Sequence, residues 1–126
     1  MPIDEPPPST SDDEGSLRLI SREALAVLVT DDAVQLVEAL GPSFFADARL
    51  PGAINLPPDR VDAMAPRLLP DSAQPVVVYC SRTCTNAEET ARHLLRLGYR
   101  DVRVFAAGKE DWVEAGLPVE RDADPA

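Results

Sequence analysis

The sequence has only two cysteines and one histidine among its 126 residues. Two cysteines four positions apart do not make a disulfide framework, and one histidine leaves too few ligands for most zinc sites. No apolar run is long enough to span a bilayer, and no charged-then-apolar leader opens the chain. We therefore expect a reduced, cytoplasmic protein that uses no metal and no other cofactor.

Basic residues are also scarce, with 12 Lys and Arg against 22 Asp and Glu, for a net charge of −10. Half of this charge lies in residues 1–15, which carry five acidic residues and no basic one. Residues 120–126 add a charge of −2, so the remainder of the chain is close to balanced at −3. This distribution promotes solubility and argues against nucleic acid or an anionic membrane as a partner.

The composition changes at both ends of the chain. Residues 1–15 are rich in Pro, Ser and Asp with almost nothing to bury, which predicts a disordered tail. Residues 16–120 contain the periodic apolar pattern of one folded domain, and residues 121–126 form a C-terminal tail. We expect a single domain with a short polar extension at each end.

Short β-prone runs alternate with amphipathic segments along the domain. Strands are predicted at 17–20, from 34 to about 40, at 53–56, at 76–79 and at 102–105. Helices are predicted at about 21–29, 43–46, 59–69 and 86–97, with a last one around Trp112, which we expect to anchor it in the core. Alternation of this kind predicts a three-layer α/β/α fold around a mostly parallel sheet.

The stretch from Pro75 to Leu97 organises the chain. Its strand, 76–79, is apolar on both faces, as expected inside a parallel sheet. Cys80 ends this strand and opens the polar loop 81–85, after which Asn86 is the expected N-cap of a helix. The free N–H groups of a helix N-terminus stabilise an anion, and a thiolate is an anion. The pattern therefore predicts Cys80 as a nucleophile at the carboxyl edge of the sheet.

Three segments together resemble a known family. They are the PGAINLP of residues 51–57, the VVVYC of residues 76–80, and Gly108 with Trp112 followed by the GLPV of residues 116–119. In this order they resemble a single rhodanese domain, of the sulfurtransferase family, over about residues 17–120. The resemblance implies a five-stranded parallel sheet flanked by helices.

The resemblance also implies a thiosulfate sulfurtransferase-like activity. Cys80 would attack the outer sulfur of thiosulfate or a related anionic donor, release sulfite and hold the sulfur as a persulfide. A thiol, a protein or cyanide would then accept the sulfur. Inward-facing amides of the loop would stabilise both the thiolate and the persulfide, because both are anions.

The loop residues have expected roles, each beside a simpler interpretation. Arg82 stands where some sulfurtransferases carry a basic donor-binding residue, or is a solvated charge. Cys84 is either a resolving thiol that pairs with Cys80 or a small residue that packs beneath the loop. The hydroxyl groups of Thr83 and Thr85 are expected to donate into the loop, unless Thr85 only caps the helix. Ser81 is expected to contribute a backbone N–H. The predicted active-site and substrate-binding loop is Ser81, Arg82, Thr83, Cys84, Thr85 and Asn86.

The chain departs from the family pattern at four positions. An Asp-x-Arg sequence often ends the second strand, but Glu38 and Leu40 stand there, so the arginine is missing. Arg49 replaces the histidine of the family's GHIPGA, and Ala107 replaces the first glycine of its later pair. Lys109, next to that turn, is expected to be solvated.

Two other classes of function stay open. Some phosphatases share this fold, but their loop has an arginine six positions after the cysteine, and that position is Asn86. A non-catalytic rhodanese-like module that binds a partner, or senses oxidants through a Cys80–Cys84 disulfide, is the other alternative.

Overall fold

The structure is a computed structural model that describes residues 18–81 and 84–121. All strand pairs within these residues are parallel, and one sheet has the order β1-β5-β4-β2-β3. The strands are β1 (Arg18–Leu19), β2 (Gln35–Glu38), β3 (Ile54–Asn55), β4 (Val76–Tyr79) and β5 (Val102–Phe105). The predicted tail at 1–15 lies outside the described residues, as does 122–126.

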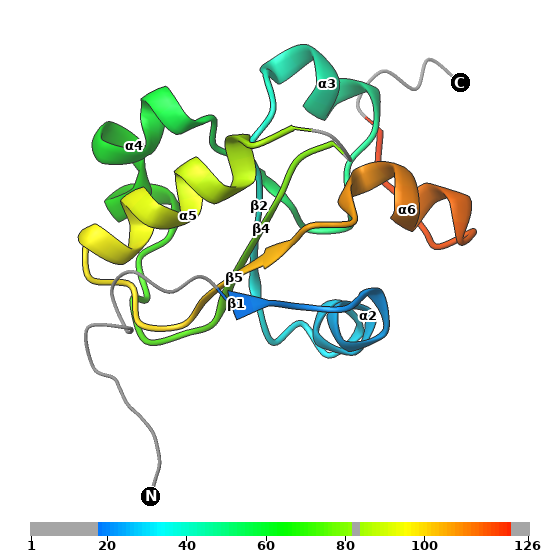
Figure 1. The fold of residues 1–126 in the computed structure, drawn as a ribbon, viewed down its shortest axis with the longest axis horizontal. Helices are drawn as coiled ribbons and strands as arrows, with labels where there is room; N and C mark the ends of the chain where they lie inside the picture. Colours follow the sequence, from blue (N-terminus) through cyan, green and yellow to red (C-terminus); the bar gives the residue numbers. More distant parts are fainter. Residues whose placement is uncertain (1–17, 82–83, 122–126) are drawn as a thin grey trace, which may run out of the picture.

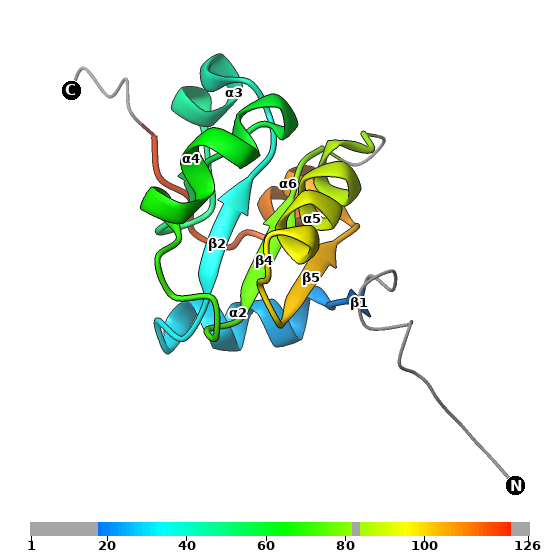
Figure 2. The ribbon, with the colours of Figure 1, turned by 90° about the vertical axis from the view of Figure 1, so that its left-hand side faces the viewer.

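Helices cover both faces of this sheet. They are α2 (Arg22–Thr30), α3 (Pro42–Asp47), the 3₁₀ turn η1 (Pro58–Arg60), α4 (Val61–Leu68), α5 (Asn86–Arg96) and α6 (Gly108–Glu114). Helices α4 and α5 lie on one face, whereas α2 and α6 lie on the other (Figures 1 and 2). The predicted three-layer α/β/α fold with five parallel strands is confirmed.

The middle strand, β4, is buried along its whole length. Val76 and Val78 pack into the cluster beneath α4 and α5, while Val77 and Tyr79 pack into the cluster beneath α2 and α6. All four side chains have no exposed surface. Side chains alternate between the faces of a strand, so a strand covered on both faces must be apolar throughout. This explains why the sequence at 76–79 is apolar at every position.

The last helix is anchored as its sequence predicts. Trp112 is 2% exposed, and its ring meets Phe105 edge to face, with the ring centroids 6.4 Å apart. Its indole N–H donates to the carbonyl of Pro118 at 2.7 Å, so the polar atom of the buried ring is satisfied. This contact attaches the segment after α6 to the β5 side of the sheet.

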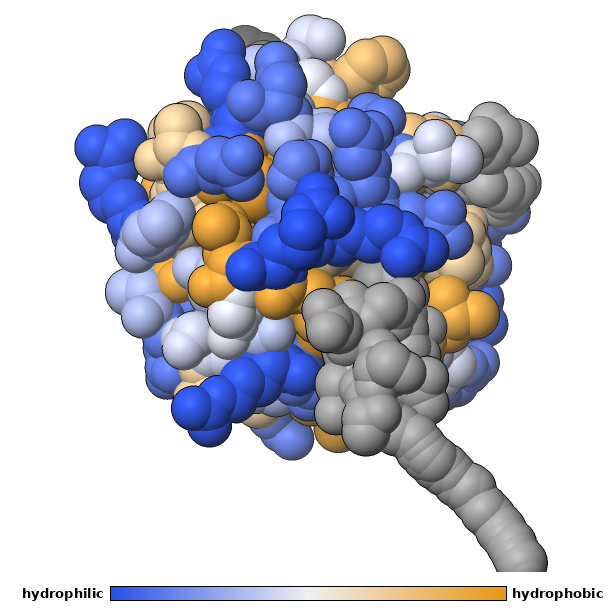
Figure 3. Space-filling model, turned by 60° about the vertical axis from the view of Figure 1, so that its left-hand side comes forward, coloured by the Kyte–Doolittle hydropathy of each residue, from blue (hydrophilic) through white to orange (hydrophobic). Residues whose placement is uncertain are grey.

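Helix α5 turns its small and aliphatic residues, Ala87, Ala91 and Leu94, toward the sheet. Gly98 follows the helix with a positive φ of 103°, the left-handed conformation that glycine adopts readily after a last turn. Hydrophilic residues cover most of the face that carries α4 and α5, and hydrophobic ones show between them in small patches (Figure 3). No helix among the described residues has the length and apolar character needed to cross a bilayer.

Candidate active site

Cys80 directly follows β4, at the carboxyl edge of the sheet. Its side chain belongs to the cluster beneath α4 and α5 and is 3% exposed. Its backbone carbonyl accepts a hydrogen bond from the Lys109 N–H at 2.9 Å, which ties the base of the loop to the start of α6. The strand therefore delivers the cysteine to the predicted edge, with its thiol at the bottom of the loop.

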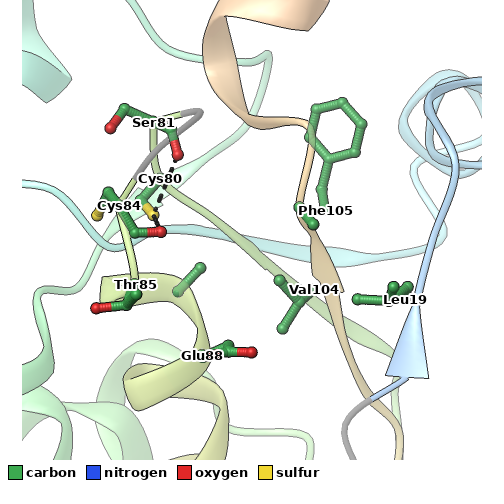
Figure 4. Close-up of a pocket in the computed structure, with 10 residues that line it drawn as sticks. Leu19, Cys80, Ser81, Cys84, Thr85, Glu88, Val104 and Phe105 are labelled. Atoms are coloured by element: carbon green, nitrogen blue, oxygen red, sulfur yellow. Dashed lines mark hydrogen bonds between the residues drawn. The ribbon is translucent and has the colours of Figure 1, made fainter.

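Two backbone carbonyls of the loop surround the Cys80 sulfur. Cys80 Sγ lies 3.6 Å from the carbonyl oxygen of Ser81 and 3.4 Å from that of Cys84 (Figure 4). The Cys84 N–H in turn donates to the Ser81 carbonyl at 3.3 Å, which closes a turn. Arg82 and Thr83 lie outside the described residues, so their predicted roles stay predictions.

The start of α5 differs from the expected cap. Thr85, not Asn86, is the N-cap residue, and its side chain makes no capping hydrogen bond. Asn86 is the first helical residue, and its side-chain amide donates to the carbonyl of Ala39 at 3.1 Å, beyond the end of β2. An amide can donate where a neighbouring strand leaves a carbonyl open, and this contact outweighs the capping preference of asparagine.

The two cysteines are neighbours, with the Cys80 thiol 3.4 Å from the backbone carbonyl of Cys84, and they differ in acidity. Burial, together with the hydrogen bond to Cys84, raises the pKa of Cys80 to about 12, although the Ala87 N–H favours its thiolate. Partial burial also disfavours the Cys84 thiolate. However, the hydrogen bonds that its sulfur accepts, from Cys80 and from the Asn86 N–H at 3.2 Å, lower the pKa of Cys84 below its ordinary value. Cys84 therefore ionises first.

This order differs from the expectation that the loop ionises Cys80. The amides near Cys80 favour its anion, as expected, but the loss of water around a sulfur 3% exposed has the larger effect. Of the two thiols, Cys84 loses its proton first, because it is less buried and receives the first amide of α5. The sequence shows neither how deeply the Cys80 sulfur is buried nor which of the two sulfurs the Asn86 N–H contacts.

A pocket of about 300 Å³ opens beside the two cysteines, at the carboxyl ends of β4 and β5. Its floor is apolar and comes from β5 and the first turn of α5, while its polar atoms come from the loop and from Glu88 (Figure 4). None of the four positions that depart from the family pattern lines it. The lining residues are Leu19, Cys80, Ser81, Cys84, Thr85, Ala87, Glu88, Val104, Phe105 and Ala106.

A buried ion pair, which the sequence analysis missed, lies next to the site. Lys109 was expected to be solvated, but its side chain is 14% exposed and its ammonium is 3.1 Å from a carboxylate oxygen of Glu38, which is fully buried. The Tyr79 hydroxyl donates to the other carboxylate oxygen at 2.7 Å and accepts from the Leu50 N–H at 3.0 Å. The cation beside Glu38 is Lys109 of α6, and position 40, where the family pattern has an arginine, is a buried leucine.

One feature of the sequence sets Lys109 apart, although it does not identify the partner. Lys109 is the only lysine of the chain, whereas the other eleven basic residues are arginines. Its ammonium also donates to the backbone carbonyls of Phe44 and Ala48. A compact cation on a flexible stem reaches three oxygens from different segments, which a planar guanidinium does less easily.

These features define a class of α/β domain, with a parallel sheet whose middle strand ends in a cysteine beside a pocket and a helix start. A model of the rhodanese-like domain matches residues 21–115. The chain therefore belongs to the rhodanese-like domain family.

Solved structures agree with this assignment. A Bacillus halodurans protein superposes with a TM-score of 0.76 at 19% identity, over 83% of this chain and 77% of that one. A rhodanese-related protein of Thermoplasma volcanium has a TM-score of 0.69 at 21% identity, over 82% and 97% of the two chains. A thiosulfate sulfurtransferase of Pseudomonas aeruginosa has a TM-score of 0.75 at 25% identity over 84% of this chain, which spans 20% of that larger protein.

Proposed function

We propose that this domain is a sulfurtransferase that moves a sulfane sulfur from thiosulfate, or a related anionic donor, to a thiol or cyanide through a persulfide on Cys80. The observation that carries the proposal is the position of Cys80. It ends the middle strand, faces the first turn of α5 and lines a pocket large enough for a small donor. The family assignment and the likeness to a thiosulfate sulfurtransferase support the same activity.

The acidity of the two cysteines gives the first step a definite form. Because the pKa of Cys80 is raised, its thiol must lose the proton as it attacks. The neighbouring Cys84 sulfur, which ionises first, accepts this proton. Cys80 Sγ forms a bond to the outer sulfur of the donor, the donor's sulfur–sulfur bond breaks, and its electron pair leaves with sulfite. The product is an anionic Cys80 persulfide beside a protonated Cys84.

The Ala87 N–H stabilises that product. It favours the Cys80 anion in the free site, and a persulfide carries its charge one atom farther toward the pocket. In the second step, a nucleophile that enters the pocket attacks the outer sulfur and restores Cys80. The proposed cycle is thus a two-step exchange with no cofactor, for which ping-pong kinetics are expected.

Intact mass measured after incubation with thiosulfate tests the proposal. Shortly after mixing, we expect the chain to have gained about one sulfur atom, which it loses when cyanide is added. Cys80→Ser must gain none. If Cys80→Ser still gains the sulfur, the carrier is Cys84 and the proposed role of Cys80 is wrong.

The contact between the two cysteines favours a second candidate, a non-catalytic module that senses oxidants. The Cys80 thiol already contacts the Cys84 carbonyl and both residues line one pocket, so a mild oxidant would join the two thiols. This candidate predicts that no sulfur donor loads Cys80, whereas hydrogen peroxide forms a reversible Cys80–Cys84 disulfide. Donor loading in the mass experiment would reject it.

A further inference from the structure

We propose that Cys84 resolves the Cys80 persulfide within the same chain, so that the domain releases the transferred sulfur as hydrosulfide and is left with a Cys80–Cys84 disulfide. This inference rests on the proposed function, because it starts from the persulfide. It adds a reductive activity in which thiosulfate is converted to sulfite and hydrosulfide at the expense of two protein thiols.

The position of Cys84 carries the inference. Its backbone carbonyl lies 3.4 Å from Cys80 Sγ, and each thiol shifts the pKa of the other, so the two side chains are close together. Both residues line the same pocket. The Asn86 N–H, 3.2 Å from Cys84 Sγ, holds this sulfur at the start of α5. A thiol held against the carrier sulfur is the first nucleophile that a new persulfide meets.

The depth of Cys80 decides which sulfur Cys84 attacks. Attack on the outer sulfur would expel the Cys80 thiolate, whose burial makes it a poor leaving group. Attack on Cys80 Sγ expels hydrosulfide, which leaves toward the pocket and solvent. Cys80 Sγ is also the atom that the Cys84 backbone carbonyl contacts, so the position of Cys84 and leaving-group acidity favour the same bond.

The step balances without an added oxidant. A bond forms between Cys84 Sγ and Cys80 Sγ, and the bond from Cys80 Sγ to the outer sulfur breaks with its electron pair on the outer sulfur. The proton that Cys84 accepted during loading leaves with that sulfur as hydrosulfide. The two thiol sulfurs are oxidised to a disulfide, and the sulfane sulfur is reduced. A dithiol reductant is then needed to open the disulfide for another cycle.

Incubation of the reduced, desalted chain with thiosulfate, without oxygen and without added thiol, tests the inference. We expect about one equivalent of hydrosulfide per chain and a chain that has lost about two hydrogen atoms and no longer reacts with iodoacetamide. Added dithiothreitol should make hydrosulfide release catalytic. The same incubation without thiosulfate is the control for adventitious oxidation and should leave both thiols free.

Two variants separate this inference from the proposed function. Cys84→Ser should load more slowly, keep the sulfur as a persulfide and release no hydrosulfide until an external thiol is added. Cys80→Ser should neither load nor release. A wild-type chain that keeps the added sulfur as stably as Cys84→Ser would overturn the inference and leave the proposed function standing. A wild-type chain that acquires no sulfur and releases no hydrosulfide would overturn both.

Discussion

Replacement of Lys109 by methionine should destabilise the domain strongly. The variant keeps most of the aliphatic stem but removes the ammonium, so the fully buried Glu38 carboxylate loses the cation 3.1 Å away. Removal of one partner of a buried ion pair costs about 3–5 kcal/mol, because the other charge stays in a poorly solvated place. The carbonyls of Phe44 and Ala48 also lose a donor, which places the expected cost in the upper part of this range.

Urea denaturation followed by the fluorescence of Trp112, the only tryptophan, measures this cost. With a slope of about 1–3 kcal/mol per molar urea, a loss of about 4.5 kcal/mol lowers the midpoint by roughly 2 M. Arg22→Met is the matched control, because it breaks a 2.8 Å ion pair between Arg22 of α2 and Asp111, which lies on α6 like Lys109. Both side chains of this control pair are partly exposed. Its midpoint should move far less.

A double-mutant cycle tests whether the loss comes from the uncompensated charge. Glu38→Gln keeps an acceptor for the Tyr79 hydroxyl but carries no charge. The double variant Glu38→Gln/Lys109→Met should therefore be more stable than Lys109→Met alone, by roughly 2 kcal/mol. A loss below about 1 kcal/mol in Lys109→Met, or a double variant no more stable than the single one, would refute the burial argument.

Two further predictions concern groups beside this pair. Burial raises the pKa of Tyr79, and the Glu38 carboxylate adds to the effect, so above about pH 10 the unfolded chain loses a proton that the folded chain keeps. The free energy of unfolding should then fall by about 1.4 kcal/mol per pH unit, which denaturation at a series of pH values measures. If the free energy of unfolding of Tyr79→Phe falls as steeply, Tyr79 is not the cause. At neutral pH, iodoacetamide should label Cys84 before Cys80, since the pKa of Cys84 is lowered and that of Cys80 is raised to about 12. Peptide mapping locates the label, and equal labelling of the two cysteines would contradict this order.

The fold was predictable because the signals for its elements are local. Val76–Tyr79 is apolar on both faces, which a strand buried from both sides requires, and the alternation with amphipathic segments implies parallel connections. Where the sequence prediction was wrong, a partner distant in the chain decided the outcome. Asn86 donates to Ala39, 47 positions earlier, rather than capping α5. No local pattern reports such a carbonyl.

The site was predictable to the same extent. A cysteine after a buried strand and before a helix can be recognised from sequence, and the structure places Cys80 there with Cys84 beside it. The acidity of the pair was not predictable, because it depends on burial and on which sulfur receives the Asn86 N–H. Lys109 was assigned to solvent for a similar reason, since its partner Glu38 is 71 positions away.

The depth of Cys80 also determines which nucleophile reaches which sulfur. If the persulfide forms, its inner sulfur stays at a position that is 3% exposed, where Cys84 is the neighbouring thiol, while the outer sulfur extends into the pocket. External acceptors therefore meet the outer sulfur and take it by transfer, whereas Cys84 meets the inner sulfur and expels hydrosulfide. Because only the first route depends on acceptor concentration, abundant acceptor favours transfer and scarce acceptor favours release. On this proposal, one buried thiol with a less buried neighbour is enough to give the domain two products.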